Sequence, residues 1–283
     1  MRTLLTVVGD GTATPVLETA LLAARKFDGR VIGLNAMTTE YAVVFGGEMG
    51  FSVSSEVDRT LEREGHERRS SARRLFESFM RAHEVPVTDG EEPPARGVSA
   101  EWREESGRQN AVVGSLGRVF DLIVVERPAK LASLAEATLE DALFESGRPV
   151  LMAPPASPKT IGERIVIAWN GSTETARTVA LSMPYLALAG SVDVVWIDGG
   201  MQPGPSGDDL AAALRRRGIA ARARLVPLGG RHAGEIFLSE ARALDCDLLV
   251  KGAYTQSRLR QMIFGGATRH IIMEADIPVI LAH

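Results

Sequence analysis

Cysteine is almost absent from this chain of 283 residues, because Cys246 is the only one. A single thiol excludes an internal disulfide and fits a reducing compartment. Long apolar runs are also missing: no stretch of about 18 apolar residues occurs, which argues against a transmembrane helix. The apolar run near the N-terminus, "TLLTVV", is too short for a secretory signal. We therefore expect a cytoplasmic protein without a membrane partner.

Several function classes lack their characteristic residues. The net charge is -4 and no block of lysines occurs, so a nucleic-acid partner held through its phosphates is not expected. The five histidines form no H-x-x-x-H pair and no pair with the cysteine, so no metal site is predicted. No G-x-x-x-x-G-K-[ST] loop and no serine in a nucleophile elbow occur, and Gly9 and Gly11 form only an incomplete dinucleotide fingerprint. Acyl-transfer and dinucleotide-dependent enzymes are therefore not supported.

What the chain does contain is one pattern written twice. Residues 2–8 read "RTLLTVV" and residues 164–169 read "RIVIAW". Each stretch is followed by a polar turn and by a segment expected to form one helix, over residues 14–27 and 173–188. Later in each half, "DLIVV" from Asp121 and "DLLVK" from Asp247 repeat in the same way. Strands with nearly continuous apolar runs that alternate with helices predict a parallel sheet covered on both faces.

The repeat predicts two α/β domains, each a doubly wound parallel sheet of five strands. We expect these domains over residues 1–155 and 162–283, joined by a linker in the proline-rich stretch "APPASPKTIGE". Their last strands, "RPVLMA" and "IPVILA", could pair edge to edge. One chain would then form a pseudo-dimer that imitates a pair of single domains.

Ligands in such sheets bind beyond the carboxyl ends of the strands, where the strand order reverses. In the second half this edge carries Asn170 and Gly171 and, after the "DLLVK" strand, the stretch "GAYTQSRLRQMIFGGATRH" that begins at Gly252. Unpaired amides in a loop that leads into a helix, together with the helix dipole, form a site for phosphate. Glycines in that loop let a phosphate approach the main chain closely.

The glycine spacing of this stretch resembles the G-x-x-G-x9-G-[ST] nucleotide loop of the universal stress proteins, and the segment from Asp247 onward looks like that family's C-terminal segment. The two-domain layout resembles the family's tandem members, which implies a Rossmann-like, universal-stress-type fold. By this resemblance the second half binds ATP or a related adenine nucleotide in a regulatory role in a stress response, with little or no turnover. The residues implied near the base are Asn170, Gly171 and Val195, and those implied at the phosphates are Gly252, Thr255, Gly265, Gly266, Ala267 and Thr268.

The chain also departs from the family pattern. Thr255 stands where the family has glycine, and Gly266 stands where it has serine or threonine. The first half departs further, because it reads "ERPAK" from Glu126 and has no glycine pair after it. Pro128 has no N–H to offer, and Glu126 would repel a phosphate. We therefore expect that the first half is degenerate and has no nucleotide site.

Two other functions stay open. In one, both loops are degenerate and the protein is a ligand-free structural or signalling scaffold for an unknown protein partner. In the other, the second half hydrolyses ATP slowly, although no general base or Mg²⁺ carboxylate pair is evident beside the loop. The sequence also leaves open whether two tandem chains associate into a homodimer. The apolar insert of residues 37–53 is either a loop folded over the domain or a lid or partner surface.

Overall fold

The computed structural model describes residues 1–9, 14–37, 55–88, 97–130, 132–200, 202–253 and 266–283. The strands of the first half are β1 (Thr3–Val7), β2 (Arg30–Met37), β3 (Ser99–Ser106), β4 (Leu122–Glu126) and β5 (Val150–Ala153). Those of the second half are β6 (Arg164–Trp169), β7 (Ser191–Asp198), β8 (Ala221–Pro227), β9 (Leu248–Gly252) and β10 (Val279–Ala282). The helices are α1 (Thr14–Phe27), α3 (Ser55–Ala82), α4 (Gln109–Leu116), the 3-10 turn η1 (Gly117–Val119), α5 (Leu134–Glu145), α6 (Thr173–Leu181), α7 (Met183–Leu188), α8 (Gly207–Arg215), α9 (Ala233–Ala243) and α10 (Gly266–Glu274).

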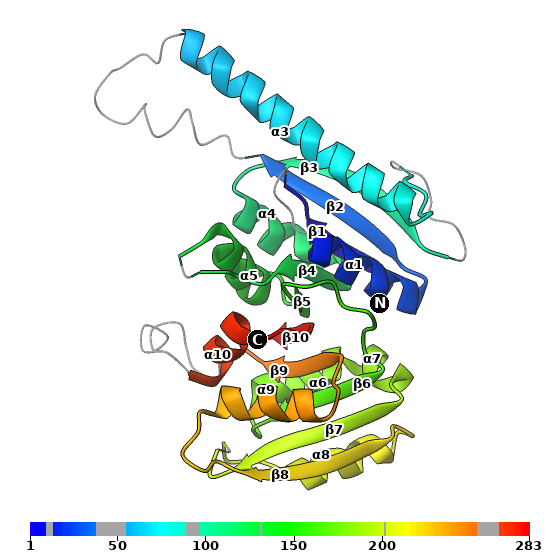
Figure 1. The fold of residues 1–283 in the computed structure, drawn as a ribbon, viewed down its shortest axis with the longest axis vertical. Coiled ribbons are helices and arrows are strands. Elements are labelled where there is room, and N and C mark those ends of the chain that lie inside the picture. The colour runs from blue at the N-terminus through cyan, green and yellow to red at the C-terminus, as the bar shows by residue number, and fades with distance from the viewer. Residues whose placement is uncertain (10–13, 38–54, 89–96, 131, 201, 254–265) are drawn as a thin grey trace.

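The described strands form one continuous sheet of ten, in the order β3-β2-β1-β4-β5-β10-β9-β6-β7-β8 (Figure 1). Within each half every strand pair is parallel, and the second half repeats the order of the first. The predicted fold class, two doubly wound five-stranded units in one chain, is confirmed.

The two halves meet through their last strands. β5 and β10 pair in antiparallel fashion, with Val279 opposite Met152 and Leu281 opposite Val150. This is the edge-to-edge pairing that the sequence suggested, and it makes the chain a pseudo-dimer. Because each last strand covers the other, neither edge is left open to pair with another protein.

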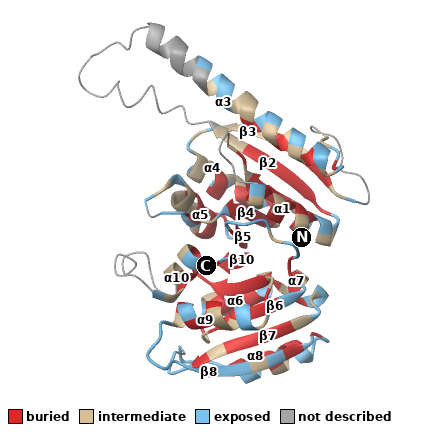
Figure 2. Ribbon diagram, in the orientation of Figure 1, coloured by how far each residue is buried: buried red, intermediate tan, exposed pale blue. Residues whose placement is uncertain are grey.

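Both faces of the central strands are buried, as Figure 2 shows in either half, whereas the edge strand β8 is largely exposed. Successive residues of a strand point to opposite faces. Leu4 accordingly packs in the apolar layer beneath α1 and α3, whereas Leu5 packs in the layer beneath α4 and α5. In the second half Val250 and Leu249 divide in the same way between the layers of α6 and α10. The nearly continuous apolar runs in the sequence follow from this double coverage.

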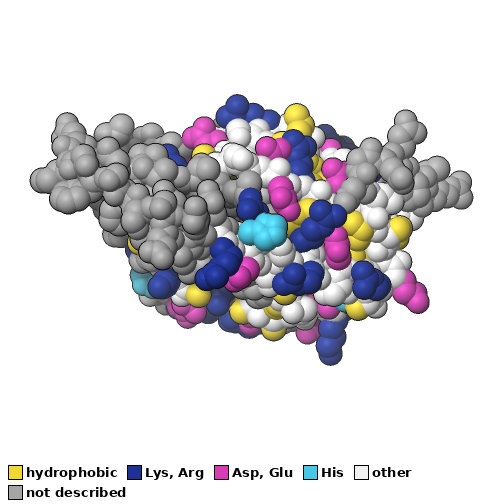
Figure 3. Space-filling view, turned by 90° about the horizontal axis from the view of Figure 1, so that it is seen from above, with side chains coloured by type: hydrophobic (Ala, Val, Ile, Leu, Met, Phe, Trp, Pro, Cys, Tyr) yellow, Lys and Arg dark blue, Asp and Glu magenta, His cyan; other side chains and the backbone are white. Residues whose placement is uncertain are grey.

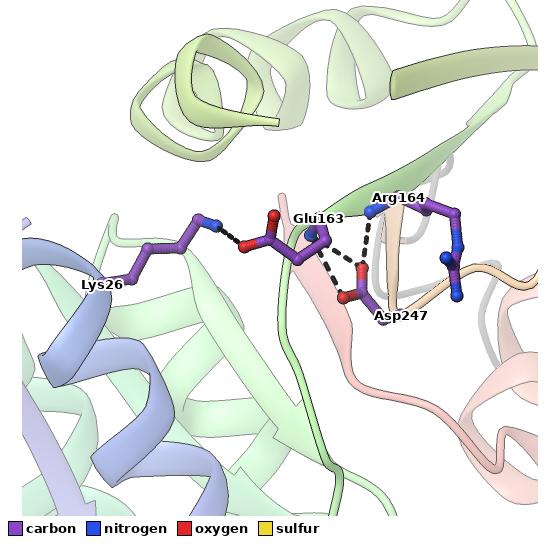
Figure 4. A network of polar contacts seen from close by, with 4 residues as sticks. All are labelled: Lys26, Glu163, Arg164 and Asp247. Carbon is purple, nitrogen blue, oxygen red and sulfur yellow. Dashed lines mark hydrogen bonds and ion pairs between the residues drawn. The ribbon is translucent and has the colours of Figure 1, made fainter. Parts of the chain in front are cut away.

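An aspartate before the fourth strand of each half holds the first strand of that half in place. In the second half, the Asp247 carboxylate accepts hydrogen bonds from the backbone amides of Glu163 and Arg164, each at 2.9 Å (Figure 4). The Glu163 side chain turns the other way and pairs with Lys26 of α1 at 2.8 Å, so this small network also spans the two halves. Glu163 is exposed, and an ion pair of that kind contributes little stability.

Asp121 does the same work in the first half. Its Oδ2 accepts from the amides of Arg2 at 2.7 Å and Thr3 at 3.0 Å, and also from the Thr3 hydroxyl at 3.1 Å. Burial of the carboxyl opposes its ionisation, but these hydrogen bonds outweigh burial and hold the pKa of Asp121 below its usual value. The matched "DL" dipeptides of the sequence repeat therefore mark the same backbone contact in both halves.

The segment 173–188, expected to be one helix, is two. α6 ends before Ser182 and α7 begins at Met183, with Pro184 in its first turn. Proline has no N–H to donate to the preceding turn, and its ring clashes with the carbonyl four residues back, so the helix breaks here. The break turns Tyr185 toward the first half, where its ring meets Phe27 edge-on with the ring centres 4.8 Å apart.

Tyr185→Phe is expected to stabilise the protein. The side chain of Tyr185 is fully buried, and its hydroxyl has no hydrogen-bond partner among the described residues. Removing an unpaired buried hydroxyl while keeping the ring should raise the free energy of unfolding by about 1 kcal/mol. Urea unfolding of the two proteins measures the difference. A loss of stability would instead reveal a bond to the hydroxyl, such as one from a buried water.

The described arginines of α3 are exposed or half-buried and lie on the solvated side of the helix. The C-terminal part of α3 packs on the sheet through Ala72, Phe76 and Met80, which share one side of the helix. Arg73 on the opposite side is exposed and pairs with Glu77 at 2.7 Å. Figure 3, viewed from this end of the molecule, shows basic and acidic side chains interspersed rather than a single basic patch. The apolar insert before this helix lies almost entirely outside the described residues.

Candidate functional site at the carboxyl edge of the second half

The strand order of the second half reverses between β6 and β9. The two strands pair only as far as Ile167 and Val250, and β6 then ends at Trp169 and β9 at Gly252. In a doubly wound sheet this is where ligands bind. We call residues 169–171 and 251–253 the switch point. It carries three of the residues predicted for the nucleotide site: Asn170, Gly171 and Gly252.

Asn170 organises the start of α6. Its Oδ1 accepts hydrogen bonds from the Thr175 hydroxyl at 2.7 Å and from the Ser172 amide at 3.2 Å. Ser172 is the N-cap of α6, and its hydroxyl accepts from the Thr175 amide. The carboxamide oxygen is thus used in hydrogen bonds within the fold. The Nδ2 donor of this half-buried residue has no such bond among the described residues, so it is available to a ligand. An aspartate in this place would present a second acceptor oxygen instead.

The segment after β7 folds back over the turn at Asn170. The Gln202 amide donates to the Asn170 carbonyl at 2.8 Å, and the Trp169 indole donates to the Pro205 carbonyl at 2.9 Å. Val195, which the resemblance implied near the base, lies within the core of β7 with none of its surface exposed. Asp198, three positions further, is the exposed residue that this strand presents at the edge.

Gly252 is a glycine because α6 comes close to it. A Cβ on Gly252 would lie 2.5 Å from the Thr175 amide nitrogen and 2.7 Å from its Cα. Real Cβ atoms do not approach backbone so closely, so any larger residue would push α6 away from β9. The sequence suggested that Gly252 makes room for a phosphate, but in the structure its Cβ side is filled by the first turn of α6.

The start of α10 is open, in contrast. Gly266 is exposed, and a Cβ added to it would have no neighbour within 4 Å among the described residues. Ala267 is half-buried and Thr268 is buried, so the first turn runs from the surface into the domain. The first amides of a helix have no partner within the helix. The predicted residues Thr255 and Gly265 lie outside the described residues.

Lys251 is the residue at the switch point that sequence reasoning missed. Its side chain is only 3% exposed, and it directly follows the apolar run "LLV" of residues 248–250. Its ammonium donates to the carbonyl of Gly252 at 2.8 Å. Burial lowers the pKa of Lys251 to about 8, against the opposing attraction of the Glu174 carboxylate. The signal was present in the sequence as a single charged residue in a strand otherwise apolar on both faces.

Glu174 and His283 complete the polar surroundings of Lys251. Burial of the Glu174 carboxyl opposes ionisation, but hydrogen bonds from its own amide and from neighbouring hydroxyls, together with the charge of His283, hold its pKa below the usual value. The His283 ring lies 3.2 Å from the Ala253 carbonyl through Nδ1, and it contacts the Phe144 ring of α5 edge-on. His283 therefore links the switch point of the second half to a helix of the first.

A family model described as the universal stress protein family matches residues 168–283. The match covers 116 of the 283 residues, and we refer to this segment, which resembles that family, as the universal stress domain. The matched segment contains the whole switch point, and of β6 it includes only the last two residues. The universal stress domain thus carries every site residue described above.

Solved structures resemble the whole chain rather than this domain alone. A universal stress protein from Archaeoglobus fulgidus DSM 4304 aligns over 99% of this chain and 96% of its own, with a TM-score of 0.70 and 13% identity. A candidate universal stress protein from Pseudomonas aeruginosa UCBPP-PA14 aligns over 100% and 93%, with a TM-score of 0.54 and 16% identity. At these identities the likeness shows the fold, which both halves share with universal stress proteins. The comparison with curated proteins gave no match.

The fourth strand of the first half differs from that of the universal stress domain at the positions of Lys251 and Gly252. Counted from the matched aspartates, Val125 stands in the place of Lys251, and Glu126 in the place of Gly252. Although Glu126 is partly exposed, desolvation of its carboxyl by the surrounding chain raises its pKa. A carboxylate at this point disfavours phosphate.

Beside the universal stress domain's α10 lies a shallow groove of about 300 Å³. It is lined by His232, Gly266, Arg269, His270, Met273 and Glu274.

Among the described residues, no three histidine, cysteine or acidic side chains are placed to hold a metal ion. No helix among the described residues is both long enough and apolar enough to cross a membrane.

Proposed function

We propose that this protein is a regulatory binding module whose universal stress domain holds an adenine nucleotide, ATP or a close relative, with little or no turnover. The family match over residues 168–283 supports the general class. The observation that most supports a nucleotide ligand is the open start of α10 at Gly266. This helix follows β9 along the chain, and doubly wound folds bind their ligands at the carboxyl ends of such strands.

The residues present fit a nucleotide with one change from the expectation. Because α6 fills the space beside Gly252, the phosphates would lie against the first turn of α10 rather than against Gly252. The free Nδ2 of Asn170 would donate to a ribose oxygen or to a ring nitrogen of the base. Val195 is too deeply buried to contact the base through its side chain.

Variants at Gly266 test the nucleotide site without disturbing the fold, because the position is open. Gly266→Ser restores the hydroxyl of the family pattern and is expected to tighten ATP binding by about two- to tenfold. Gly266→Asp places a carboxylate against the phosphates and is expected to weaken binding by about tenfold or more. Isothermal titration calorimetry with ATP measures both effects.

Gly266→Ala is the matched control, since it adds a Cβ with neither hydroxyl nor charge and should bind ATP as the parent does. Equal affinity of all four proteins would place the nucleotide elsewhere. No heat of binding at millimolar ATP, in protein free of adenine absorbance, would end the proposal.

A ligand-free scaffold is the second candidate, and two observations favour it. Glu126 occupies the matching position in the first half, and the segment after β7 already covers the turn at Asn170. In that case the pseudo-dimer itself, held by β5 and β10, would be the functional unit. Purified protein without bound adenine, and without ATP affinity, is the outcome that this candidate expects.

A further inference from the structure

The buried ammonium of Lys251 is not explained by the fold. Strand β9 is covered on both faces, and its other residues are apolar or glycine. An ammonium can donate three hydrogen bonds, but among the described residues the only acceptor in reach of Lys251 is the carbonyl of its own neighbour, Gly252. No carboxylate of the described chain lies within ion-pair distance of it.

We propose that Lys251 binds an anion: its ammonium receives a phosphate group of the ligand held at the switch point. This rests on the proposed nucleotide function and goes beyond it, because it assigns the charge that holds the phosphate to a strand residue rather than to the glycine loop. Once the anion is present, the two remaining N–H donors of Lys251 gain acceptors and its charge gains a partner.

The charge of the buried Lys251 ammonium is not compensated by an ion pair within the described residues. Burying an ammonium without a paired anion is costly, and proteins keep such groups where a ligand or a reaction uses them. The nearest described acid that affects Lys251 is Glu174, but its carboxylate is engaged by the Ser172 and Thr173 side chains and by its own amide. His283, whose charge also acts on Glu174, has its ring Nδ1 3.2 Å from the Ala253 carbonyl. The described part of the chain thus leaves the ammonium without a close counter-ion.

Position favours phosphate as the anion. The hydrogen bond to Gly252 places the ammonium at the carboxyl end of β9, and α10 returns to the same edge with its first amides. Lysine binds phosphate as a point charge, and helix-start amides add directional donors. The first half lacks the ammonium, because Val125 stands in the place of Lys251, and it carries the Glu126 carboxylate in the place of Gly252. Anion binding should therefore be confined to the second half.

A comparison of ATP with adenosine isolates the contribution of Lys251. Lys251→Met keeps the length of the side chain and removes its charge. It should weaken ATP binding by about tenfold to a hundredfold and leave adenosine binding within about twofold. Lys159→Met, the same change at an exposed lysine of the linker, is the matched control and should alter neither. Calorimetry gives both affinities, and circular dichroism verifies that the variants are folded.

The pH profile gives an independent readout. Because only the protonated ammonium attracts phosphate, ATP affinity of the parent should fall as the pH rises above about 8, whereas that of Lys251→Met should stay level. Equal ATP affinity in parent and Lys251→Met, or equal pH profiles, overturns the proposal.

Inorganic pyrophosphate separates failure of this proposal from failure of the nucleotide function. If the parent binds pyrophosphate but not ATP, the nucleotide function alone fails, and loss of pyrophosphate binding in Lys251→Met then supports the anion site. If pyrophosphate binding persists in Lys251→Met, or if the parent binds neither compound, the role of Lys251 is refuted.

Discussion

Lys251→Met is expected to raise the free energy of unfolding at neutral pH by about 3 kcal/mol. Burial lowers the pKa of Lys251 from its ordinary value of 10.5 to about 8. The two values differ by about 2.5, and each unit corresponds to about 1.4 kcal/mol of preference for the neutral form. Methionine has a similar length and no charge, so it fills the same space without the cost of burying an ammonium.

The direction of the pH dependence follows from the depressed pKa. Between about pH 8 and 10.5 the unfolded chain still holds a proton on Lys251 that the folded chain has released. The parent therefore gains stability as the pH rises through this window, and the advantage of Lys251→Met shrinks over the same range. Below about pH 8 both states of the parent are protonated, and the advantage is constant.

Urea unfolding of the parent, Lys251→Met and Lys159→Met over a series of pH values measures these effects. The exposed control should differ from the parent by no more than about 0.5 kcal/mol at any pH. A Lys251→Met variant that is less stable than the parent at neutral pH would show that the free protein already pairs the ammonium with a counter-ion.

Gly252→Ala is expected to lower the free energy of unfolding by about 3 kcal/mol. The added Cβ would meet the Thr175 amide nitrogen at 2.5 Å and its hydroxyl oxygen at 2.6 Å. Backbone atoms cannot rotate away as the end of a side chain can, so the first turn of α6 must separate from β9. That movement also breaks the hydrogen bonds between Asn170, Ser172 and Thr175 that start the helix.

Gly266→Ala, the same change at the open end of α10, is the control for Gly252→Ala. It should equal the parent or exceed it by up to about 1 kcal/mol, because alanine favours helix more than glycine does. Thermal and urea unfolding of the three proteins provide the comparison. If Gly252→Ala were as stable as the parent, α6 would not lie against Gly252, and the space beside it would be free for a ligand after all.

The architecture was predictable because it depends on patterns that are local in sequence. Apolar runs between glycine-bearing turns marked the strands, and the repeat of Asp121 at Asp247 marked equivalent places in two sheets. The pairing of "RPVLMA" with "IPVILA" was predictable too, since two matching last strands each leave an edge to be covered. The break before Pro184 was visible in the sequence but was passed over in favour of one longer helix.

The candidate site was predictable in part. Asn170, Gly171 and Gly252 do meet at the switch point, because parallel strands bring their carboxyl ends to one edge. The complete burial of Val195 was not predictable. The alternation of residues along a strand indicates which face of the sheet a side chain lies on, but not how far the residue lies from the carboxyl edge. Nor could the sequence reveal that the carboxamide oxygen of Asn170 is engaged by Thr175.

The sequence by itself determined that this protein is one α/β unit written twice, because period and turn chemistry act over a few residues. Only the tertiary structure decided what each site residue touches. α6 takes the space beside Gly252, and Lys251 is buried with one hydrogen-bond acceptor among the described residues. Both outcomes depend on how segments far apart in the chain pack against each other.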